Sequence, residues 1–314
     1  MKTISILIPT YNEENNVQPL CDALRGQLAR LADRYDYEIV FIDNKSLDGT
    51  REKIMELCAL DKRVKAILNA RNFGSENSAY YGTLQTTGDC TISVSADFQD
   101  PPELLPRMVE AWEQGHKIVS MVKNHSRENP LIRAIRTAYY KFLHRMSYNK
   151  AIIEQFTGFG LYDKVFLDMV RELDDPLPFS RGIPAELGFS IKIIPYTQAK
   201  RHAGKSSNNL FSLYDQAMLG ITTYTKAAPR LATFFGALVS GMSFIAALVC
   251  LILKLAGCDI HSFALPASGL FLLGGVQLFF LGLMGEYIIS IQRRIMQRPL
   301  VVEEGRVNFD EQAH

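Results

Sequence analysis

Three short polar clusters, at residues 10–13, 43–44 and 97–100, stand directly after apolar runs in the first hundred residues. If each apolar run is a strand of one parallel sheet, the clusters meet at the edge where such sheets bind ligands. Asp97 and Gln99 offer carboxylate and amide oxygens, which Mg²⁺ or Mn²⁺ binds together with phosphate oxygens and water. The chemistry expected here is binding of a diphosphate through a divalent cation. The alternative is that the aspartates of the third cluster only cap the helix that follows them.

The elements that must position these clusters alternate between strand and helix. The strand-length runs are nearly all apolar, which is typical of a parallel sheet covered on both faces. The sequence therefore predicts an α/β fold with a mostly parallel sheet. The expected strands are 3–9, 38–43, 64–69 and 90–96, and the expected helices are 14–32, 46–60 and 75–87.

The net charge, the cysteines and the N-terminal sequence limit the classes of partner and indicate the compartment of the protein. The net charge of the 314 residues is only +1, so no nucleic-acid partner is indicated. The five cysteines show neither zinc-site spacing nor a disulfide framework, which is typical of a reducing compartment. The apolar run at the N-terminus ends at Pro9, too early for the core of a signal peptide, so we expect a cytoplasmic catalytic part.

Two long segments, 231–253 and 263–285, carry no charged side chain. Each reaches the roughly 20 apolar residues that cross a bilayer. Basic residues flank the pair at both outer ends, which by the positive-inside rule places both ends in the cytoplasm. We therefore expect a multi-pass protein of the inner (plasma) membrane. The alternative is a pair of helices buried in a protein core.

These segments divide the chain into three expected parts. They are a cytoplasmic domain over 1–229, a transmembrane pair over 230–290 and a cytoplasmic tail over 291–314. The tail is polar from residue 301 onward and is expected to be loose. The segment 130–147 places basic residues between apolar residues at helical spacing, which predicts an amphipathic juxtamembrane helix or, alternatively, an ordinary surface helix.

Several motifs occur together and in order along the chain. They are IPTYNEENN at 8–16, FIDNKSLDGT at 41–50, RNFG at 71–74, ADFQDPPE at 96–103, RGIPAELGF at 181–189, RHAGKS at 201–206 and GGVQLFFLGLMGEYI at 274–288. In this combination the chain resembles glycosyltransferase family 2, and within it the polyprenyl-phosphate glycosyltransferases, such as the bactoprenol glucosyltransferases and the dolichol-phosphate mannose synthases. The likeness covers almost the whole chain and implies the GT-A type of nucleotide-binding α/β domain.

The resemblance also implies roles for the residues at the strand ends. It implies that Asp97 and Gln99 hold Mg²⁺ or Mn²⁺ at the diphosphate, with Asp97 as the catalytic residue. Carboxylates accept hydrogen bonds from uracil and ribose, and a tyrosine ring packs on a base, so the implied donor contacts are physically reasonable. The donor-binding residues implied are Pro9, Tyr11, Glu13, Asp43 and Ser95.

Three positions depart from the pattern of the family. Ser95 replaces the first aspartate of the usual DxD, and Asn44, followed by Lys45, replaces an aspartate of the usual DDGS. Gly158 falls where many relatives place an aspartate that is often assigned as the catalytic base. That last loss need not abolish activity, because a phosphate monoester has a second pKa of about 6 and is already a nucleophile near neutral pH.

The expected function is transfer of a hexose from a nucleotide diphosphate sugar, with UDP-glucose as the first candidate, to polyprenyl (undecaprenyl) phosphate. We expect direct, inverting displacement of the diphosphate. The resemblance also implies a homo-oligomer, a tetramer. Cations must hold the acceptor phosphate at the membrane surface, and arginine offers it a two-pronged contact. The candidates are Lys123, Arg127, Arg133, Arg201 and Lys205.

Two other functions are weighed against this one. A processive polysaccharide synthase needs a QxxRW-type product-binding segment, and the single tryptophan, Trp112, does not stand in one. A non-catalytic membrane adaptor that kept the fold is the alternative motivated by Ser95 and Gly158. Metal-dependent turnover of a nucleotide sugar separates the adaptor from the enzyme.

Overall fold

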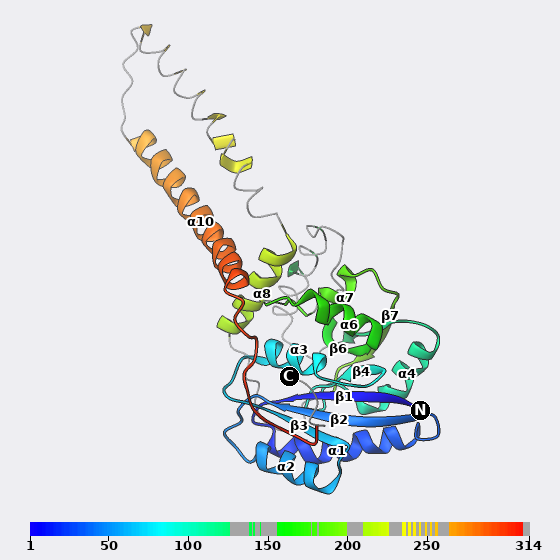
Figure 1. Cartoon of the computed structure of the whole chain (residues 1–314). Coiled ribbons are helices and arrows are strands. Elements are labelled where there is room, and N and C mark those ends of the chain that lie inside the picture. The colour runs from blue at the N-terminus through cyan, green and yellow to red at the C-terminus, as the bar shows by residue number, and fades with distance from the viewer. Residues whose placement is uncertain are drawn as a thin grey trace.

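The structure is a computed structural model of the whole chain. It describes isolated residues between 138 and 145 and between 234 and 256, and otherwise the ranges 1–125, 156–176, 178–180, 182–199, 210–225 and 264–309. Figure 1 shows an α/β body built on a sheet, from which the long helix α10 (Ala264–Ile295) extends.

One sheet of eight strands forms the body of the described chain. The strands are β1 (Lys2–Thr10), β2 (Tyr35–Asp43), β3 (Val64–Asn69), β4 (Cys90–Ser93), β5 (Ile118–His125), β6 (Phe156–Asp163), β7 (Ile191–Thr197) and β8 (Glu303–Val307). Their order across the sheet is β7-β5-β6-β4-β1-β2-β3-β8. The central pairs β4–β1, β1–β2 and β2–β3 are parallel, as is β5–β7, whereas β6 and β8 run antiparallel to their neighbours. The prediction of a mostly parallel sheet is confirmed.

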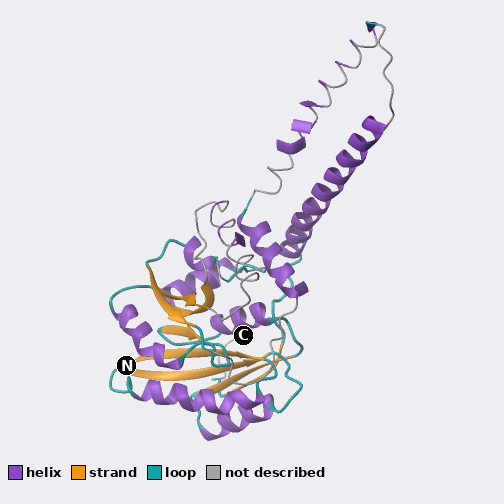
Figure 2. Ribbon diagram, turned by 180° about the vertical axis from the view of Figure 1, so that it is seen from behind, coloured by secondary structure: helices purple, strands orange, loops and turns teal. Residues whose placement is uncertain are grey.

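Helices cover both faces of this sheet, with α1 and α2 on one face and α3 on the other (Figures 1 and 2). The 3₁₀ turn η1 (Pro102–Leu104) precedes α4. The helices of the body are α1 (Glu14–Ala29), α2 (Thr50–Leu60), α3 (Ser75–Leu84), α4 (Leu105–Glu113), α6 (Lys164–Leu173), α7 (Ile183–Glu186) and α8 (Leu210–Tyr224).

The central strand β1 shows why apolar residues stand at successive positions in the strands of this sheet. Ile4, Ile6 and Ile8 are fully buried in the cluster that contains residues of α1, while Leu7 is fully buried in a second cluster, against Tyr81 of α3. Burying one such side chain contributes roughly 1.5–3 kcal/mol. A strand covered on both faces therefore requires apolar residues at successive positions rather than at every second one.

The strand predicted over 90–96 ends early, at Ser93, and the helix predicted over 46–60 begins late, at Thr50. In both cases the residues that leave the regular element lie next to one of the polar clusters, 94–96 before residues 97–100 and 46–49 shortly after residues 43–44. The carboxyl ends of the strands are therefore irregular loops, and these loops form the candidate site.

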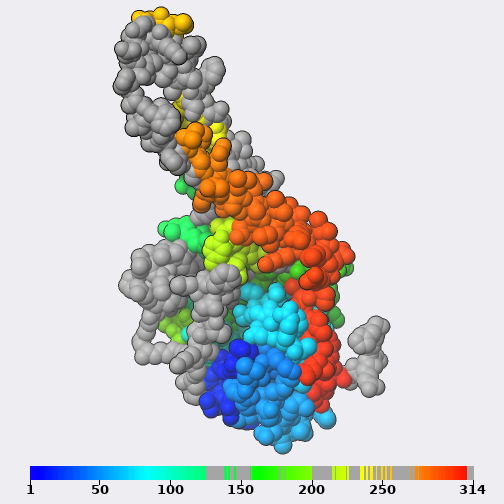
Figure 3. All heavy atoms as spheres, turned by 90° about the vertical axis from the view of Figure 1, so that its left-hand side faces the viewer, coloured from blue at the N-terminus to red at the C-terminus, as the bar shows by residue number. Residues whose placement is uncertain are grey.

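The prediction of a loose tail from residue 301 is wrong for Glu303–Val307. These residues form β8, which pairs with β3 and places Ala66 opposite Val307 and Leu68 opposite Gly305. Figure 3 shows the C-terminal segment lying against the N-terminal part of the body. The sequence EEGRV lacks the apolar alternation of a strand because β8 is an edge strand, half exposed along its length.

The two predicted membrane spans fall in sparsely described parts of the chain. The structure describes only isolated residues of 231–253, and the predicted amphipathic helix 130–147 also lies largely outside the described residues. The predicted span 263–285 falls in α10, which continues to Ile295. Among the residues that the structure describes, no helix combines the length and the apolar character needed to cross a membrane.

Polar contacts attach α10 to the body near its C-terminal end. The Tyr214 hydroxyl of α8 donates to Glu286 Oε1 at 3.4 Å, and the Tyr287 hydroxyl donates to the carbonyl of Thr225 at 2.8 Å. One residue before the helix ends, Arg294 Nη1 lies 2.7 Å from Asp175 Oδ1. The C-terminal half of α10 is therefore held against α8 and the loop after α6.

Candidate active site at the strand ends

The loops after β1, β2 and β4 share an unusual backbone feature. Each holds one non-glycine residue in the left-handed region, Asn12 with φ 57°, Lys45 with φ 62° and Phe98 with φ 62°. Such conformations are uncommon away from glycine, and they cluster at functional sites. Because β4, β1 and β2 are neighbours in the sheet, these three loops emerge side by side at one edge.

The first two loops are joined by hydrogen bonds. The backbone N–H of Asn12 donates to Ser46 Oγ at 2.9 Å, and the N–H of Leu47 donates to Asn12 Oδ1 at 2.8 Å. The N–H of Glu13 donates to Thr50 Oγ1 at 2.8 Å. These reciprocal bonds hold Glu13, the buried residue that precedes α1, beside the loop after β2.

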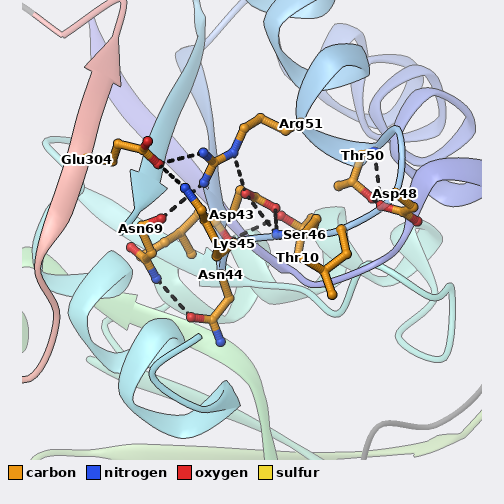
Figure 4. Close-up of polar contacts among 12 residues, drawn as sticks. Thr10, Asp43, Asn44, Lys45, Ser46, Asp48, Thr50, Arg51, Asn69 and Glu304 are labelled. Atoms are coloured by element: carbon orange, nitrogen blue, oxygen red, sulfur yellow. Dashed lines mark hydrogen bonds and ion pairs between the residues drawn. The ribbon is translucent and has the colours of Figure 1, made fainter. Parts of the chain in front are cut away.

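Asp43 ends β2 and is fully buried. Arg51 Nε donates to Asp43 Oδ2 at 2.8 Å, and the N–H of Ser46 approaches both carboxylate oxygens at 3.3 Å (Figure 4). A charge-assisted contact of this kind offsets the cost of burying the carboxylate. The loop after β2 therefore wraps around Asp43, whose predicted contact with the donor stays a prediction.

Arg51 carries this network across the sheet to the C-terminal strand. Its Nη1 lies 2.7 Å from Glu304 Oε2, and its Nη2 donates to the carbonyl of Asn69 at 3.1 Å. Lys45 Nζ lies 2.7 Å from the same oxygen of Glu304. Hydrogen bonds from Lys45 and Arg51 lower the pKa of Glu304 to about 2. Sequence reasoning missed both Arg51 and Glu304, and no local signal joins two residues so far apart in the chain.

Asn44, where the family pattern has an aspartate, uses both ends of its amide. Its Oδ1 accepts from the Phe73 N–H at 2.9 Å and from Asn69 Nδ2 at 3.1 Å. Its Nδ2 donates to Asn72 Oδ1 at 2.9 Å. An aspartate at residue 44 would have no N–H to donate to Asn72 Oδ1. Asparagine, which replaces the family's aspartate here, therefore fits the hydrogen-bonding groups of the loop that follows β3.

Asp100 organises the third loop, after β4. The Ser95 N–H donates to Asp100 Oδ2 at 3.0 Å, and the Tyr196 hydroxyl of β7 donates to Asp100 Oδ1 at 2.9 Å. Burial raises the pKa of Asp100, an effect that these hydrogen bonds and the charge of Lys123 only partly offset. Asp100 thus connects the loop to β7. The alternative that the aspartates of this loop only cap the following helix is wrong, because neither η1 nor α4 has a side-chain hydrogen bond at its N-cap.

Asp97 and Gln99 lie on the same loop as the predicted metal ligands. The Gln99 N–H donates to Asp97 Oδ1 at 3.1 Å, and Gln99 Oε1 accepts from Gln198 Nε2 at 3.0 Å. Within the described residues, no three His, Cys, Asp or Glu side chains gather into a metal site. One carboxylate and one amide suit Mg²⁺ or Mn²⁺ only when diphosphate oxygens and water supply the remaining ligands. The loop therefore fits a cation that binds together with the nucleotide.

The other predicted site residues divide into two groups. Pro9 and Tyr11 are half-buried at the end of β1, and Lys123, also half-buried, lies near the end of β5, where its charge acts on Asp100. These residues therefore belong to the same edge of the sheet as Asp97. The predicted acceptor-phosphate residues Arg127, Arg133, Arg201 and Lys205 lie outside the described residues.

Gly158 lies in β6 with φ 98°, and the Tyr162 hydroxyl donates to its carbonyl at 3.2 Å. A side chain at residue 158 would have open space around its Cβ, but the backbone there is strained for any L-residue. The glycine is therefore required by the backbone of this strand.

Comparison with known proteins identifies the family of this chain. Residues 5–169, which contain most of β1, the described elements from α1 to β6 and the three loops, match the family model described as "Glycosyl transferase family 2". The chain belongs to glycosyl transferase family 2. The prediction of a glycosyltransferase is thereby confirmed, and the α/β body is the GT-A-like domain of this family 2 enzyme.

The family 2 enzyme resembles its relatives along nearly its whole length. It is 32% identical to the "Putative glycosyltransferase CsbB" of Bacillus subtilis, over 98% of this chain and 93% of that protein. It is 30% identical to the "Bactoprenol glucosyl transferase" of Shigella phage SfX, over 96% of this chain and 99% of that protein.

A solved structure of similar fold is the mannosyltransferase PcManGT from Pyrobaculum calidifontis in complex with GDP-Man and Mn²⁺. It is 14% identical and covers 94% of this chain and 87% of its own, with a TM-score of 0.48.

Proposed function

We propose that this enzyme transfers a hexose from a nucleotide diphosphate sugar, with UDP-glucose as the first candidate, to polyprenyl phosphate. The observation that carries the proposal is the hydrogen-bonded junction of the loops after β1 and β2, which brings Glu13 beside the loop that wraps Asp43. Relatives of nearly the same length named bactoprenol glucosyl transferase support glucose as the sugar and a polyprenyl phosphate as the acceptor.

The proposed reaction is a single inverting displacement. An oxygen of the acceptor phosphate forms a bond to the anomeric carbon, while the bond between that carbon and the donor's β-phosphate oxygen breaks, and the nucleoside diphosphate leaves. Asp97 and Gln99 would hold Mg²⁺ or Mn²⁺, which neutralises the departing diphosphate when bound. The acceptor needs no proton removed, so the glycine at residue 158 is compatible with turnover.

The donor and the acceptor phosphate are proposed to bind at this same edge of the sheet. Tyr11 packs on the base and Glu13 accepts from the nucleoside, while Pro9, Asp43 and Ser95 shape the same pocket. Among the residues that the structure describes, Lys123 at the end of β5 is the candidate ligand of the acceptor phosphate. The other proposed phosphate ligands are Arg127, Arg133, Arg201 and Lys205.

We further propose that the chain is anchored in the inner (plasma) membrane by two helices over 230–290, with its catalytic part in the cytoplasm. In support, α10 exposes large apolar side chains, among them Leu278, Phe279 and Leu281, each more than 60% exposed. β8 follows α10 in the chain and pairs with β3, so the residues before and after the proposed membrane helices lie on the same side of the membrane. If α10 crosses the membrane, another segment before it must therefore cross as well. Resistance to carbonate extraction, and protease access to the C-terminus only from the cytoplasmic side, test this arrangement. A tetramer, which would show in the mass of the purified protein, is proposed from the relatives alone.

The test of the function is transfer of label into lipid. The purified chain is incubated with undecaprenyl phosphate, Mg²⁺ or Mn²⁺ and a panel of radiolabelled nucleotide sugars. We expect label in the organic phase from one donor, and a loss of about 10²–10³-fold in Asp97→Ala, as for removal of one transition-state stabilising group. The matched control is Glu103→Ala, an exposed acidic residue that follows the same loop.

Each outcome of this assay has a meaning. Label from one donor that disappears only in Asp97→Ala supports the transfer and names the sugar. Equal loss in both variants would indicate a general defect of the loop. No lipid-linked label from any donor, with no nucleotide-sugar hydrolysis, would favour the non-catalytic adaptor.

A further inference from the structure

A chain of ion pairs, here called the relay, connects Glu304 of the C-terminal strand β8 through Arg51 to Asp43 in the predicted donor site. Glu304 of β8 contacts Lys45 and Arg51, both at 2.7 Å, and Arg51 in turn holds the buried carboxylate of Asp43. Figure 4 shows Glu304 on one strand of the sheet and Asp43 on another, with the guanidinium between them. No residue of β8 belongs to the motifs by which the donor site was predicted.

The guanidinium of Arg51 is held on three sides. Its Nε donates to Asp43 of β2, its Nη1 to Glu304 of β8 and its Nη2 to the carbonyl of Asn69 in β3. An arginine fork has a fixed planar geometry, so three acceptors fix both its position and its rotation. Removing the Glu304 carboxylate leaves the guanidinium with two acceptors, Asp43 and the Asn69 carbonyl, so the position of Arg51 against Asp43 is less restrained.

Lys45, the second cation that contacts Glu304, lies in the loop after β2 and affects the conformation of that loop. It stands directly between Asn44 and Ser46 in the left-handed region, with φ 62°. A left-handed non-glycine residue is energetically unfavourable and persists only where its surroundings hold it. The Glu304 carboxylate supplies one such restraint from outside the loop.

We propose that Glu304 is a positioning residue for donor binding, acting through Arg51 on Asp43 and on the loop of residues 44–50. The C-terminal strand is then part of the donor site, although it touches no reacting atom. This inference rests on the proposed function, since it concerns affinity for the nucleotide sugar. These contacts reach the predicted donor-binding residue Asp43 and no reacting atom. We therefore expect substitution of Glu304 to change KM for the donor rather than the rate of the chemical step.

The test compares two glutamates of the same strand. Glu304→Ala in the full chain is expected to raise KM for the nucleotide sugar about tenfold, the size expected for one charge-assisted hydrogen bond, with kcat within about twofold of wild type. Glu303→Gln is the matched control, because Glu303 bonds to Tyr81 and Arg306 instead of the Asp43 loop. Its donor KM is expected to stay within about twofold of wild type.

A double-mutant cycle separates positioning from general loosening of the strand. Lysine at residue 51 cannot reach three acceptors, so Arg51→Lys is expected to remove most of the effect of Glu304→Ala on donor KM. Glu304→Gln keeps the size and one acceptor oxygen, and is expected to give a smaller increase in KM. It also serves as the variant to measure if Glu304→Ala does not fold.

The outcomes distinguish this inference from the function on which it rests. A wild-type protein that neither binds nor turns over a nucleotide sugar overturns both. Wild-type activity with an unchanged donor KM in Glu304→Ala and Glu304→Gln overturns the positioning role alone. An equal increase of KM in Glu303→Gln, or full additivity with Arg51→Lys, shows that strand docking rather than the Arg51 fork is responsible, and also overturns it.

Discussion

At the scale of single residues, Asn44 replaces the carboxylate of the family pattern and changes what the residue can bind. It accepts from Phe73 and Asn69 and donates to Asn72, while Asn72 Oδ1 also accepts from the Gly74 N–H. Turning the Asn72 amide to suit a carboxylate would lose that last bond. The position is therefore fitted to an amide.

We expect Asn44→Asp to lower the free energy of unfolding by about 1–3 kcal/mol, the cost of leaving a buried polar contact unsatisfied. Thermal unfolding of the purified variant measures this. Asn15→Asp, at an exposed position of α1, is the control and should unfold as the wild type does. An Asn44→Asp variant as stable as wild type would contradict the amide network.

Gly158 raises the question of whether the missing aspartate can be restored. We expect Gly158→Asp to give no gain in turnover, because the acceptor is already ionised, and to lose about 1–2 kcal/mol of stability to its left-handed backbone. Gly158→Ala carries the same strain without the carboxylate, so the two variants should match in kcat and in unfolding temperature. A tenfold faster Gly158→Asp beside an unchanged Gly158→Ala would show instead that a base is missing.

At the scale of elements, the Glu304 carboxylate connects β8 to Lys45 and Arg51. Its pKa in the folded chain is about 2, below the ordinary value of 4.5, because Lys45 and Arg51 donate to it. A depressed pKa means that the carboxylate contributes stability that is complete above about pH 4.5. That contribution disappears as the pH falls toward 2.

The measurement is the difference in unfolding temperature between wild type and Glu304→Gln across pH. We expect the difference to be constant from pH 8 to about 5 and to shrink below that, because protonation makes the wild-type side chain neutral as well. The same series with Glu303→Gln shows how much of any change belongs to the strand as a whole. A difference that vanishes already near pH 6 would contradict the pairing of Glu304 with Lys45 and Arg51.

The elements also show what sequence can and cannot predict. The runs at β1, β2 and β3 were predictable because burial on both faces forces continuous apolar sequence, which is a local signal. β8 was not, because an edge strand with one exposed face can read EEGRV and leave no periodic trace. The position of Glu304 depends on pairing with residues more than 250 positions away, as in the contact with Arg51 at a separation of 253.

At the scale of the whole molecule, the family pattern predicted where the site lies but not which of its residues contact one another. Asp97, Gln99 and Glu13 were predicted and lie at one edge of the sheet, as the parallel topology requires. That Asp43 would be fully buried under Arg51 was not predictable, because motif matching assigns a residue to a role without its neighbours. The acceptor side stays a prediction, since four of its five proposed cations lie outside the described residues.

The late position of β8 in the chain has a consequence for biogenesis. A ribosome makes the chain from its N-terminus, so β1 to β4 leave the exit tunnel long before residue 304 exists. The strands of the centre can pair during synthesis, but the relay from Glu304 to Arg51 must close a loop of some 250 residues. The newborn enzyme therefore acquires this restraint on its nucleotide loop only after α10 and β8 have been made.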